Sequence, residues 1–105
     1  MAHDDEAPPL ALRVTRTEFA ADGIRLFELR RADGAGLPPF TAGAHLSVRV
    51  PSGAMRNYSL CNDPAERDRY VIAVKRDERG RGGSVSLVDG VREGDTLEVR
   101  PPHNL

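Results

Sequence analysis

The sequence predicts an all-β domain in which about six short strands and one short helix close into an antiparallel barrel. Two observations favour this fold class. Apolar residues alternate with polar ones in short runs, and these runs are separated by turns rich in glycine and proline. No segment has the apolar periodicity of a long helix. Short, evenly spaced strands favour a barrel because closure removes exposed strand edges, and 105 residues suit a single domain.

The clearest strand covers residues 45–50, where Leu46, Val48 and Val50 share one face and polar residues occupy the other. Pro51-Ser52-Gly53 forms a turn after it, which predicts a hairpin. Residues 23–30 carry apolar side chains on both faces, as in a strand that is covered on both sides. The full set of predicted strands is a segment beginning at Leu10, followed by residues 23–30, 45–50, 55–61, 70–74 and 96–99.

A short helix is predicted from Ser84 to Gly90. Val85, Leu87 and Val88 give it an apolar side, and glycine is a common residue at a helix end. The glycine-rich stretch before it, RDERGRGG, is too polar to belong to the core.

Both ends of the chain suggest how the domain is bounded. Residues 1–9 (MAHDDEAPP) are acidic and proline-rich and lack the features of a signal peptide, so we expect a disordered tail. Residues 10–105 then form the domain. The chain ends shortly after the last strand and Pro101-Pro102, a typical linker composition, which predicts that a further domain follows in a longer protein.

The composition excludes several classes of function. Fifteen basic residues balance 16 acidic ones, so there is no strong field for nucleic acid or an anionic membrane. No apolar run approaches the roughly 18 residues of a membrane span. Cys61 is the only cysteine, which fits a reducing cytoplasm, and we interpret it as a buried structural residue. The three histidines, among them His45 and His103, lack the spacing of a metal site, so no metal is expected.

The first motif with chemical potential is Arg56-Asn57-Tyr58-Ser59, in the second arm of the predicted hairpin. Residues two apart in a strand share a face, so Arg56 and Tyr58 point one way and Asn57 and Ser59 the other. A cation beside a flat ring suits a planar ligand that carries a phosphate. Taken alone, the pair is more often an exposed arginine and a surface tyrosine of an ordinary sheet.

The second motif is Gly80-Arg81-Gly82-Gly83-Ser84, which leads into the predicted helix. Glycines let backbone amides approach a ligand, and a helix N-terminus presents unpaired N–H groups to an anion. The motif lacks the lysine of a P-loop and the third glycine of G-x-G-x-x-G. A flexible loop with Ser84 as helix N-cap fits it equally well.

The third feature is the strand Tyr70-Val71-Ile72-Ala73-Val74-Lys75. The small Ala73 would let a flat ring lie near the backbone, and the N–H and C=O groups of Ala73, Val74 and Lys75 would then face the polar edge of that ring. Taken alone, a plain core strand is the default interpretation of this segment.

The order and spacing of these features resemble the flavin domain of the ferredoxin-reductase-like superfamily. Within it, the sequence is most similar to the phthalate dioxygenase reductase and vanillate O-demethylase oxidoreductase group. The resemblance rests on R-x-Y-S at Arg56–Ser59 followed by Leu-Cys-Asn-Asp, on the A-V-K strand end, and on G-R-G-G-S, in that order. It covers nearly the whole chain from Leu10 and is densest from Pro38 to Asn104.

The resemblance implies a six-stranded antiparallel Greek-key barrel with one short helix, and it implies site residues. Tyr58 would pack on the isoalloxazine ring, and Ser59 would lie near flavin N5 as the candidate catalytic residue. Arg56 would bind the flavin phosphate, with Asn57 beside it in the same element. The backbone of Ala73, Val74 and Lys75 would contact the pyrimidine edge of the ring. The phosphate would also be held by Arg81, Gly82, Gly83 and Ser84.

The resemblance further implies FMN as the cofactor, with FAD as the alternative. Such reductases relay electrons from NAD(P)H through the flavin to a [2Fe–2S] centre and on to a partner aromatic-ring oxygenase or demethylase. The nicotinamide and iron–sulfur domains are absent from this chain. The rival from another class, a non-redox β-barrel binding module, should show a basic groove with several exposed aromatic residues. Here there are two Tyr, three Phe and no Trp.

Overall fold

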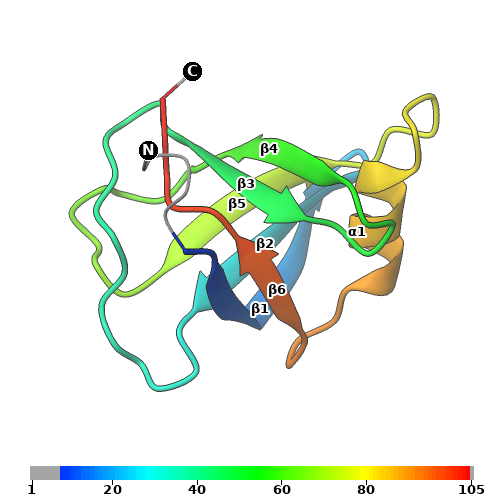
Figure 1. The fold of residues 1–105 in the computed structure, drawn as a ribbon. Helices are drawn as coiled ribbons and strands as arrows, with labels where there is room; N and C mark the ends of the chain where they lie inside the picture. Colours follow the sequence, from blue (N-terminus) through cyan, green and yellow to red (C-terminus); the bar gives the residue numbers. More distant parts are fainter. Residues whose placement is uncertain (1–7, 105) are drawn as a thin grey trace, which may run out of the picture.

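The computed structural model describes residues 8–104 and confirms the predicted all-β barrel (Figure 1). Strand β1 is longer than its alternating residues indicate, because its second half is exposed and is defined by pairing rather than by burial. Most of the predicted tail of residues 1–9 lies outside the described residues. The elements are β1 (Leu10–Ala21), β2 (Ile24–Arg30), β3 (His45–Arg49), β4 (Met55–Ser59), β5 (Tyr70–Lys75), α1 (Gly83–Gly90) and β6 (Thr96–Val99).

The six strands form one antiparallel sheet in the order β4-β3-β6-β1-β2-β5. Strands β4 and β5 are therefore the two edges of the sheet. The sheet curls until these edges meet at the bridge between Leu60 and Ile72, where Cys61 N–H also donates to Val71 O over 2.9 Å. The barrel is thus joined along this line at the Leu60 end of β4.

The core fills the inside of the curled sheet with side chains from every strand. Leu12, Leu46 and Val99 are fully buried there, as their alternation predicts. In β2 the fully buried face carries Phe27 and Leu29, while the apolar residues of the other face are only half-buried. Burying apolar surface is the main stabilising contribution in a domain of this size.

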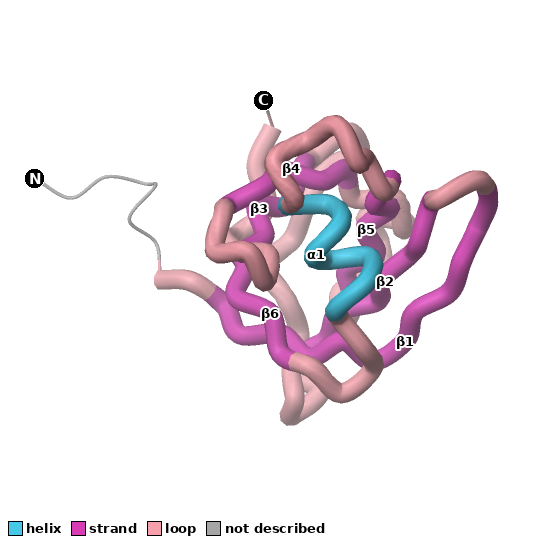
Figure 2. Tube along the Cα trace, turned by 90° about the vertical axis from the view of Figure 1, so that its right-hand side faces the viewer, coloured by secondary structure: helices cyan, strands magenta, loops and turns pink. Residues whose placement is uncertain are grey.

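Helix α1 lies across one end of the curled sheet, with the strands arranged around it in Figure 2. Its Leu87 and Val88 enter the core. The helix begins one residue before the predicted start and ends at the predicted Gly90. It has eight residues, whereas a membrane-spanning helix needs about 20, and no candidate membrane helix is found among residues 8–104.

The turn predicted at Pro51-Ser52-Gly53 is present, and a second turn contains Gly94. Gly53 and Gly94 have φ angles of 96° and 97°, in the left-handed region that glycine adopts without strain. Gly53 lies in the β3–β4 hairpin, and Gly94 lies in the turn before β6.

Candidate functional site

The register of β3 and β4 confirms which residues of the R-N-Y-S motif share a face. Tyr58 pairs with Leu46, and Arg56 pairs with Val48. Paired residues point to the same side of a sheet, and Leu46 and Val48 are fully buried. Arg56 and Tyr58 therefore start from the inner face at the edge of the sheet, where both are half-buried.

The outer face of β4 carries the other two residues of the motif. Asn57 and Ser59 are exposed. The Ser47 hydroxyl donates to Asn57 Oδ1 over 2.5 Å, and Ser47 Oγ lies 2.9 Å from His103 Nε2. Asn57 is thus held by neighbours on its own face.

The two edge strands bring the first and third predicted motifs together. Residue 60 pairs with residue 72, and continuing this antiparallel register places Ser59 opposite Ala73 and Tyr58 opposite Val74. Ladder pairing of β4 with β5 does not continue beyond this bridge in the described residues. The facing edges of both strands therefore have backbone groups directed at the space between them.

The N-terminus of α1 forms the third side of this site. Gly82 is the N-cap, with φ 87° and no side-chain cap hydrogen bond. Its carbonyl accepts the Ser86 N–H at 2.9 Å, the first hydrogen bond of the helix. The N–H groups before Ser86 have no carbonyl of the preceding turn to bond, and they carry the positive end of the helix dipole.

Arg56 lies directly against this helix end. A Cβ added at Gly83 would lie 3.0 Å from Arg56 Nε and 3.2 Å from its Cγ, so a larger residue here would require the Arg56 side chain to shift by a few tenths of an ångström. Arg56 Nη1 donates to Met55 O at 3.1 Å, and the ion pairs found within residues 8–104 do not include Arg56. The guanidinium and the first turn of α1 thus lie side by side, and both are groups that bind anions in proteins; we call this arrangement the cradle.

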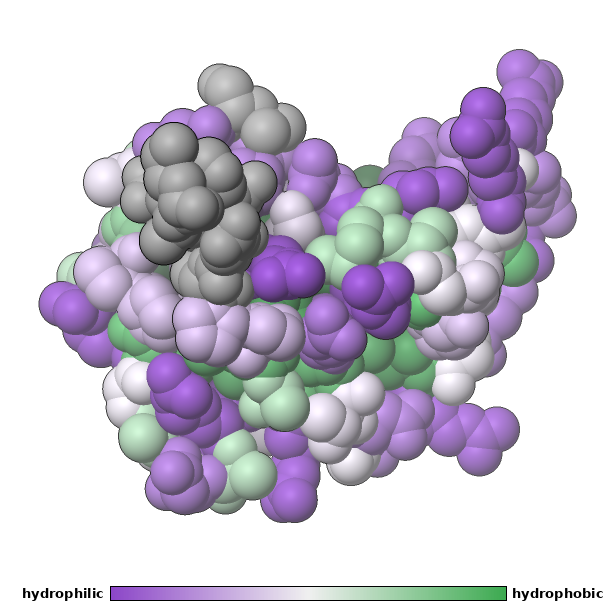
Figure 3. Space-filling view, in the orientation of Figure 1, coloured by the Kyte–Doolittle hydropathy of each residue, from purple (hydrophilic) through white to green (hydrophobic). Residues whose placement is uncertain are grey.

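Ser84 is in the first turn of α1 and is not the N-cap, so the alternative interpretation of this serine as a cap is wrong. The left-handed Gly82 takes that position. Ser84 Oγ instead accepts the Asp77 N–H at 2.9 Å, which holds the loop before the helix and leaves the hydroxyl proton free to donate. Arg81 is exposed in this loop, which forms the hydrophilic projection at the upper right of Figure 3.

Two opposing effects act on the pKa of Tyr58. Burial raises the pKa of its phenol, and the nearby Arg56 guanidinium opposes this shift. Tyr58 is therefore a neutral ring that packs on the core from the edge of the sheet. A neutral aromatic face at this position suits stacking against another flat ring.

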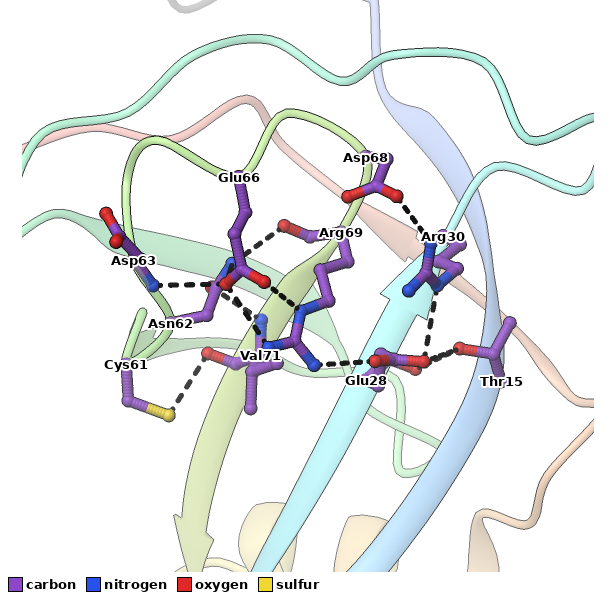
Figure 4. A network of polar contacts seen from close by, with 10 residues as sticks. All are labelled: Thr15, Glu28, Arg30, Cys61, Asn62, Asp63, Glu66, Asp68, Arg69 and Val71. Carbon is purple, nitrogen blue, oxygen red and sulfur yellow. Dashed lines mark hydrogen bonds and ion pairs between the residues drawn. The ribbon is translucent and has the colours of Figure 1, made fainter.

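A polar network that sequence reasoning missed organises the loop between β4 and β5 (Figure 4). Glu28 of β2 accepts hydrogen bonds from Arg69 at 2.8 Å, Thr15 at 2.7 Å and Arg30 at 3.3 Å. Burial by itself would raise the pKa of Glu28, but these hydrogen bonds outweigh it and lower the pKa to about 2. Arg69 also pairs with Glu66 in the loop, at 2.9 Å.

Asn62 joins this network to the first residues of β5. Its side-chain oxygen accepts the Val71 N–H at 2.9 Å, and its side-chain nitrogen donates to Arg69 O at 3.0 Å. The Asn62 side chain thus bonds the Val71 N–H as a neighbouring strand would, next to the bridge between Leu60 and Ile72. The spacing between β4 and β5 is fixed by this junction.

One prediction about a single residue needs correction. Cys61 is exposed, not buried, because it follows the bridge residue Leu60 on the outward side. Partial desolvation of its thiol raises the pKa of Cys61, so the thiol is not activated. His45 and His103, distant in sequence, lie with ring centroids 6.4 Å apart. No group of three or more metal-ligating side chains was found among residues 8–104.

A surface hollow of about 500 Å³ lies away from the predicted site. It is lined by residues of β6, the end of β3 and the segment after α1, such as Arg49, Val91 and Glu98. None of the predicted site residues line it. A flat ligand that lies along strand edges needs an open face more than a deep cavity, and the β4–β5 opening offers such a face.

The barrel, the start of α1 beside Arg56 and the ring of Tyr58 at the sheet edge are the features expected of a flavin-binding barrel domain. The comparison with family models agrees, since residues 11–104 match the oxidoreductase FAD-binding domain. The chain belongs to this family and is a flavin-binding oxidoreductase domain.

Individual relatives confirm the resemblance stated from the sequence. The phthalate 4,5-dioxygenase oxygenase reductase subunit of Pseudomonas putida is 62% identical over 87% of this chain and 28% of its own length. The vanillate O-demethylase oxidoreductase of Pseudomonas putida is 47% identical over 90% of this chain and 30% of its own length. The chain therefore spans less than a third of these relatives.

A solved structure supports the fold in detail. Phthalate dioxygenase reductase, described as a modular structure for electron transfer from pyridine nucleotides to [2Fe–2S], superposes with a TM-score of 0.90 at 56% identity. The match covers 92% of this chain and 30% of that one.

Proposed function

We propose that this chain is the FMN-binding domain of an NAD(P)H-dependent reductase, which relays electrons to a [2Fe–2S] centre and a partner aromatic-ring oxygenase or demethylase. The observation that carries the proposal is the packing of the Arg56 side chain across Gly83, at the amide-rich start of α1. A flavin phosphate is the ligand group that best fits this cradle.

The residues present fit a flavin at both of its ends. Arg56, the amides of Gly82 and Gly83, and the Ser84 hydroxyl would bind the phosphate, with Arg81 adding charge from the loop. Tyr58 would stack on the isoalloxazine ring, and Ser59 on the next position of β4 would donate near N5. The exposed Asn57 would support Ser59 from the outer face of the strand.

The facing edge of β5 suits the polar rim of the ring. Ala73 pairs with Leu26 and Val74 with Arg25 on the β2 side of the strand. Val71 directs its N–H and C=O to the β4 side, and backbone groups alternate along a strand, so those of Ala73 and Lys75 would hydrogen-bond the pyrimidine portion while those of Val74 face β2. The small side chain of Ala73 lets the ring approach the strand.

FMN fits better than FAD because FAD adds a second phosphate and an adenine. An adenine needs an aromatic platform near the cradle. Among the other aromatic residues, Tyr70 is buried and meets Phe40 in a T-shaped edge contact. Phe19 packs on Arg25, which bonds the opposite end of α1. These positions favour a ligand with a single phosphate.

The chemistry of the relay belongs to the cofactor, and the protein positions it. A bound flavin supplies the exchange between two-electron hydride transfer and single-electron transfer. The nicotinamide and [2Fe–2S] groups would be held elsewhere in a longer protein, in line with the modular electron transfer from pyridine nucleotides to [2Fe–2S] in phthalate dioxygenase reductase. The oxygenase or demethylase partner follows from the same likeness. A cytoplasmic location would suit such a reductase.

The test is a titration of the chain with FMN, FAD and riboflavin, followed by flavin fluorescence. We expect FMN to bind more tightly than riboflavin, because riboflavin lacks the phosphate, and at least as tightly as FAD. Equal binding of FMN and riboflavin would contradict the phosphate cradle, and preference for FAD would replace FMN as the cofactor.

Replacing Arg56 with Ala should weaken FMN while leaving riboflavin nearly unchanged. A charge-assisted hydrogen bond contributes about 1.5–3 kcal/mol, which corresponds to about 10- to 150-fold in the FMN dissociation constant. Equal losses for both ligands would mean that Arg56 is structural only.

A further inference from the structure

The C-terminal half of α1 is held by two arginines from neighbouring strands. Arg25 of β2 donates to Val88 O, one of the last carbonyls of the helix, and to Thr17 Oγ1 at 3.0 Å. Its guanidinium also lies over Phe27, 4.9 Å from the ring centroid. Arg25 therefore caps the negative end of the helix and ties it to the β1–β2 hairpin.

Arg76 makes the second attachment, immediately after β5. It pairs with Asp89 through two nitrogens, Nε to Oδ1 at 2.9 Å and Nη2 to Oδ2 at 2.8 Å. Its Nη1 lies 2.9 Å from Glu78 Oε1. Its backbone N–H donates to Gly23 O at 2.9 Å, so the residue is also anchored in the sheet.

The Arg76–Asp89 pair closes a ring that contains Arg81, Gly82, Gly83 and Ser84, whereas Arg56 faces this ring from β4. The chain leaves the sheet at Arg76, forms the loop, and returns through α1 to Asp89. Within this ring, the Asp77 N–H donates to Ser84 Oγ. An eight-residue helix is about 12 Å long, so a tilt at Asp89 displaces the first turn of the helix.

The other contacts of α1 constrain its direction less. Arg25 reaches a single main-chain oxygen of the helix, Val88 O. Leu87 and Val88 bury the helix in the core, but apolar packing is not directional. At the other end, Gly83 meets Arg56 only by van der Waals contact. The bidentate pair at Asp89 is the contact best suited to set the direction of the helix axis.

We infer that Arg76, acting through Asp89, is a positioning residue that aims the first turn of α1 at the ligand phosphate beside Arg56. This inference rests on the proposed function, because it assumes that a flavin phosphate occupies the cradle. Arg76 itself is neutralised by Asp89 and Glu78, so it serves the helix and not the ligand.

The test is the Asp89→Asn variant of the full chain, titrated with FMN and with riboflavin. An exposed ion pair with side chains 33% and 49% exposed contributes little to stability, so we expect the urea midpoint to stay nearly unchanged. FMN should bind about two- to fivefold more weakly, riboflavin should be unaffected, and Asp89→Glu should restore most of the FMN affinity.

A matched control separates positioning from a general change of charge. Glu98→Gln removes the same charge from an exposed pair with Arg49, whose side chains are 43% and 39% exposed. This variant should leave the ratio of FMN to riboflavin affinity unchanged. An equal effect of both variants on that ratio would overturn the inference.

The remaining outcomes each have one meaning. Tighter FMN binding by Asp89→Asn would show that the released Arg76 contacts the phosphate directly, which overturns positioning. No change in the ratio would make the pair merely structural. The Arg56→Ala variant distinguishes failure of this inference from failure of the proposed function. If Arg56→Ala lowers the ratio of FMN to riboflavin affinity and Asp89→Asn does not, only the positioning inference fails. If neither variant lowers the ratio, the proposed phosphate cradle fails as well.

Discussion

The Glu28→Gln variant tests the polar network that joins Glu28 of β2 to the loop between β4 and β5. Glu28 is only 15% exposed and accepts hydrogen bonds from Arg69, Thr15 and Arg30. These bonds lower the pKa of its carboxyl from 4.5 to about 2. One pKa unit corresponds to about 1.4 kcal/mol, so the shift corresponds to at most about 3 kcal/mol of stability at neutral pH.

The sign of the pH dependence follows from the direction of the shift. The pKa of Glu28 in the folded state is below that of the unfolded chain, so the folded protein holds the charged form more strongly. This contribution is complete above pH 5 and is lost as the pH falls from about 4.5 to about 2. Since glutamine has no charge to lose, the cost of Glu28→Gln should shrink over that range.

The assay is urea unfolding, followed by circular dichroism, of the wild type and Glu28→Gln at several pH values from 7 down to 2.5. We expect Glu28→Gln to lower the free energy of unfolding by about 2–3 kcal/mol at pH 7, and by much less at pH 2.5. The control Glu98→Gln removes an exposed pair and should cost less than about 1 kcal/mol. A cost of Glu28→Gln that is the same at both pH values would refute the reasoning.

Three further predictions concern the phosphate cradle and the helix that carries it. Gly83→Ala places a methyl group 3.0 Å from Arg56 Nε, so we expect the arginine to be displaced. FMN should then bind about tenfold more weakly, which is roughly 1.4 kcal/mol, and riboflavin binding should be unchanged. Unchanged FMN binding in calorimetry would place the phosphate elsewhere. Ser84→Ala removes one hydrogen-bonding hydroxyl and should weaken FMN by about 1 kcal/mol, and an unaltered FMN affinity would remove Ser84 from the site. Leu87→Ala empties a fully buried position of α1 and should lower the free energy of unfolding by about 2–5 kcal/mol in urea; a loss below about 1 kcal/mol would mean that α1 is not anchored by its core face.

The strands were predictable from the sequence where burial and turn chemistry coincide. In β3, Leu46 and Val48 alternate with polar residues, and Gly53 permits the turn that follows. In β1 the alternation stops at Val14, because the rest of the strand is exposed on both faces. The length of that strand is set by pairing with β2, which a local pattern does not reveal.

For the candidate site, the sequence predicted which residues of a strand share a face, but not which distant residues meet. Position in the strand correctly put Arg56 and Tyr58 on one face. The network at Glu28 joins side chains up to 41 residues apart, Arg69 among them, and no local signal marks it. The left-handed Gly82 displaced Ser84 from the cap, since the chain must turn sharply to enter the helix.

The central claim is that a flavin lies across the β4–β5 opening with its phosphate at the start of α1. The most direct measurement is a comparison of backbone amide shifts, in ¹H–¹⁵N spectra of the chain, on saturation with FMN and with riboflavin. We predict that Tyr58 and Ala73 shift with both ligands, whereas Gly83 and Ser84 shift strongly with FMN alone. Shifts confined to the hollow beside β6, or the same response of Gly83 and Ser84 to both ligands, would contradict the account.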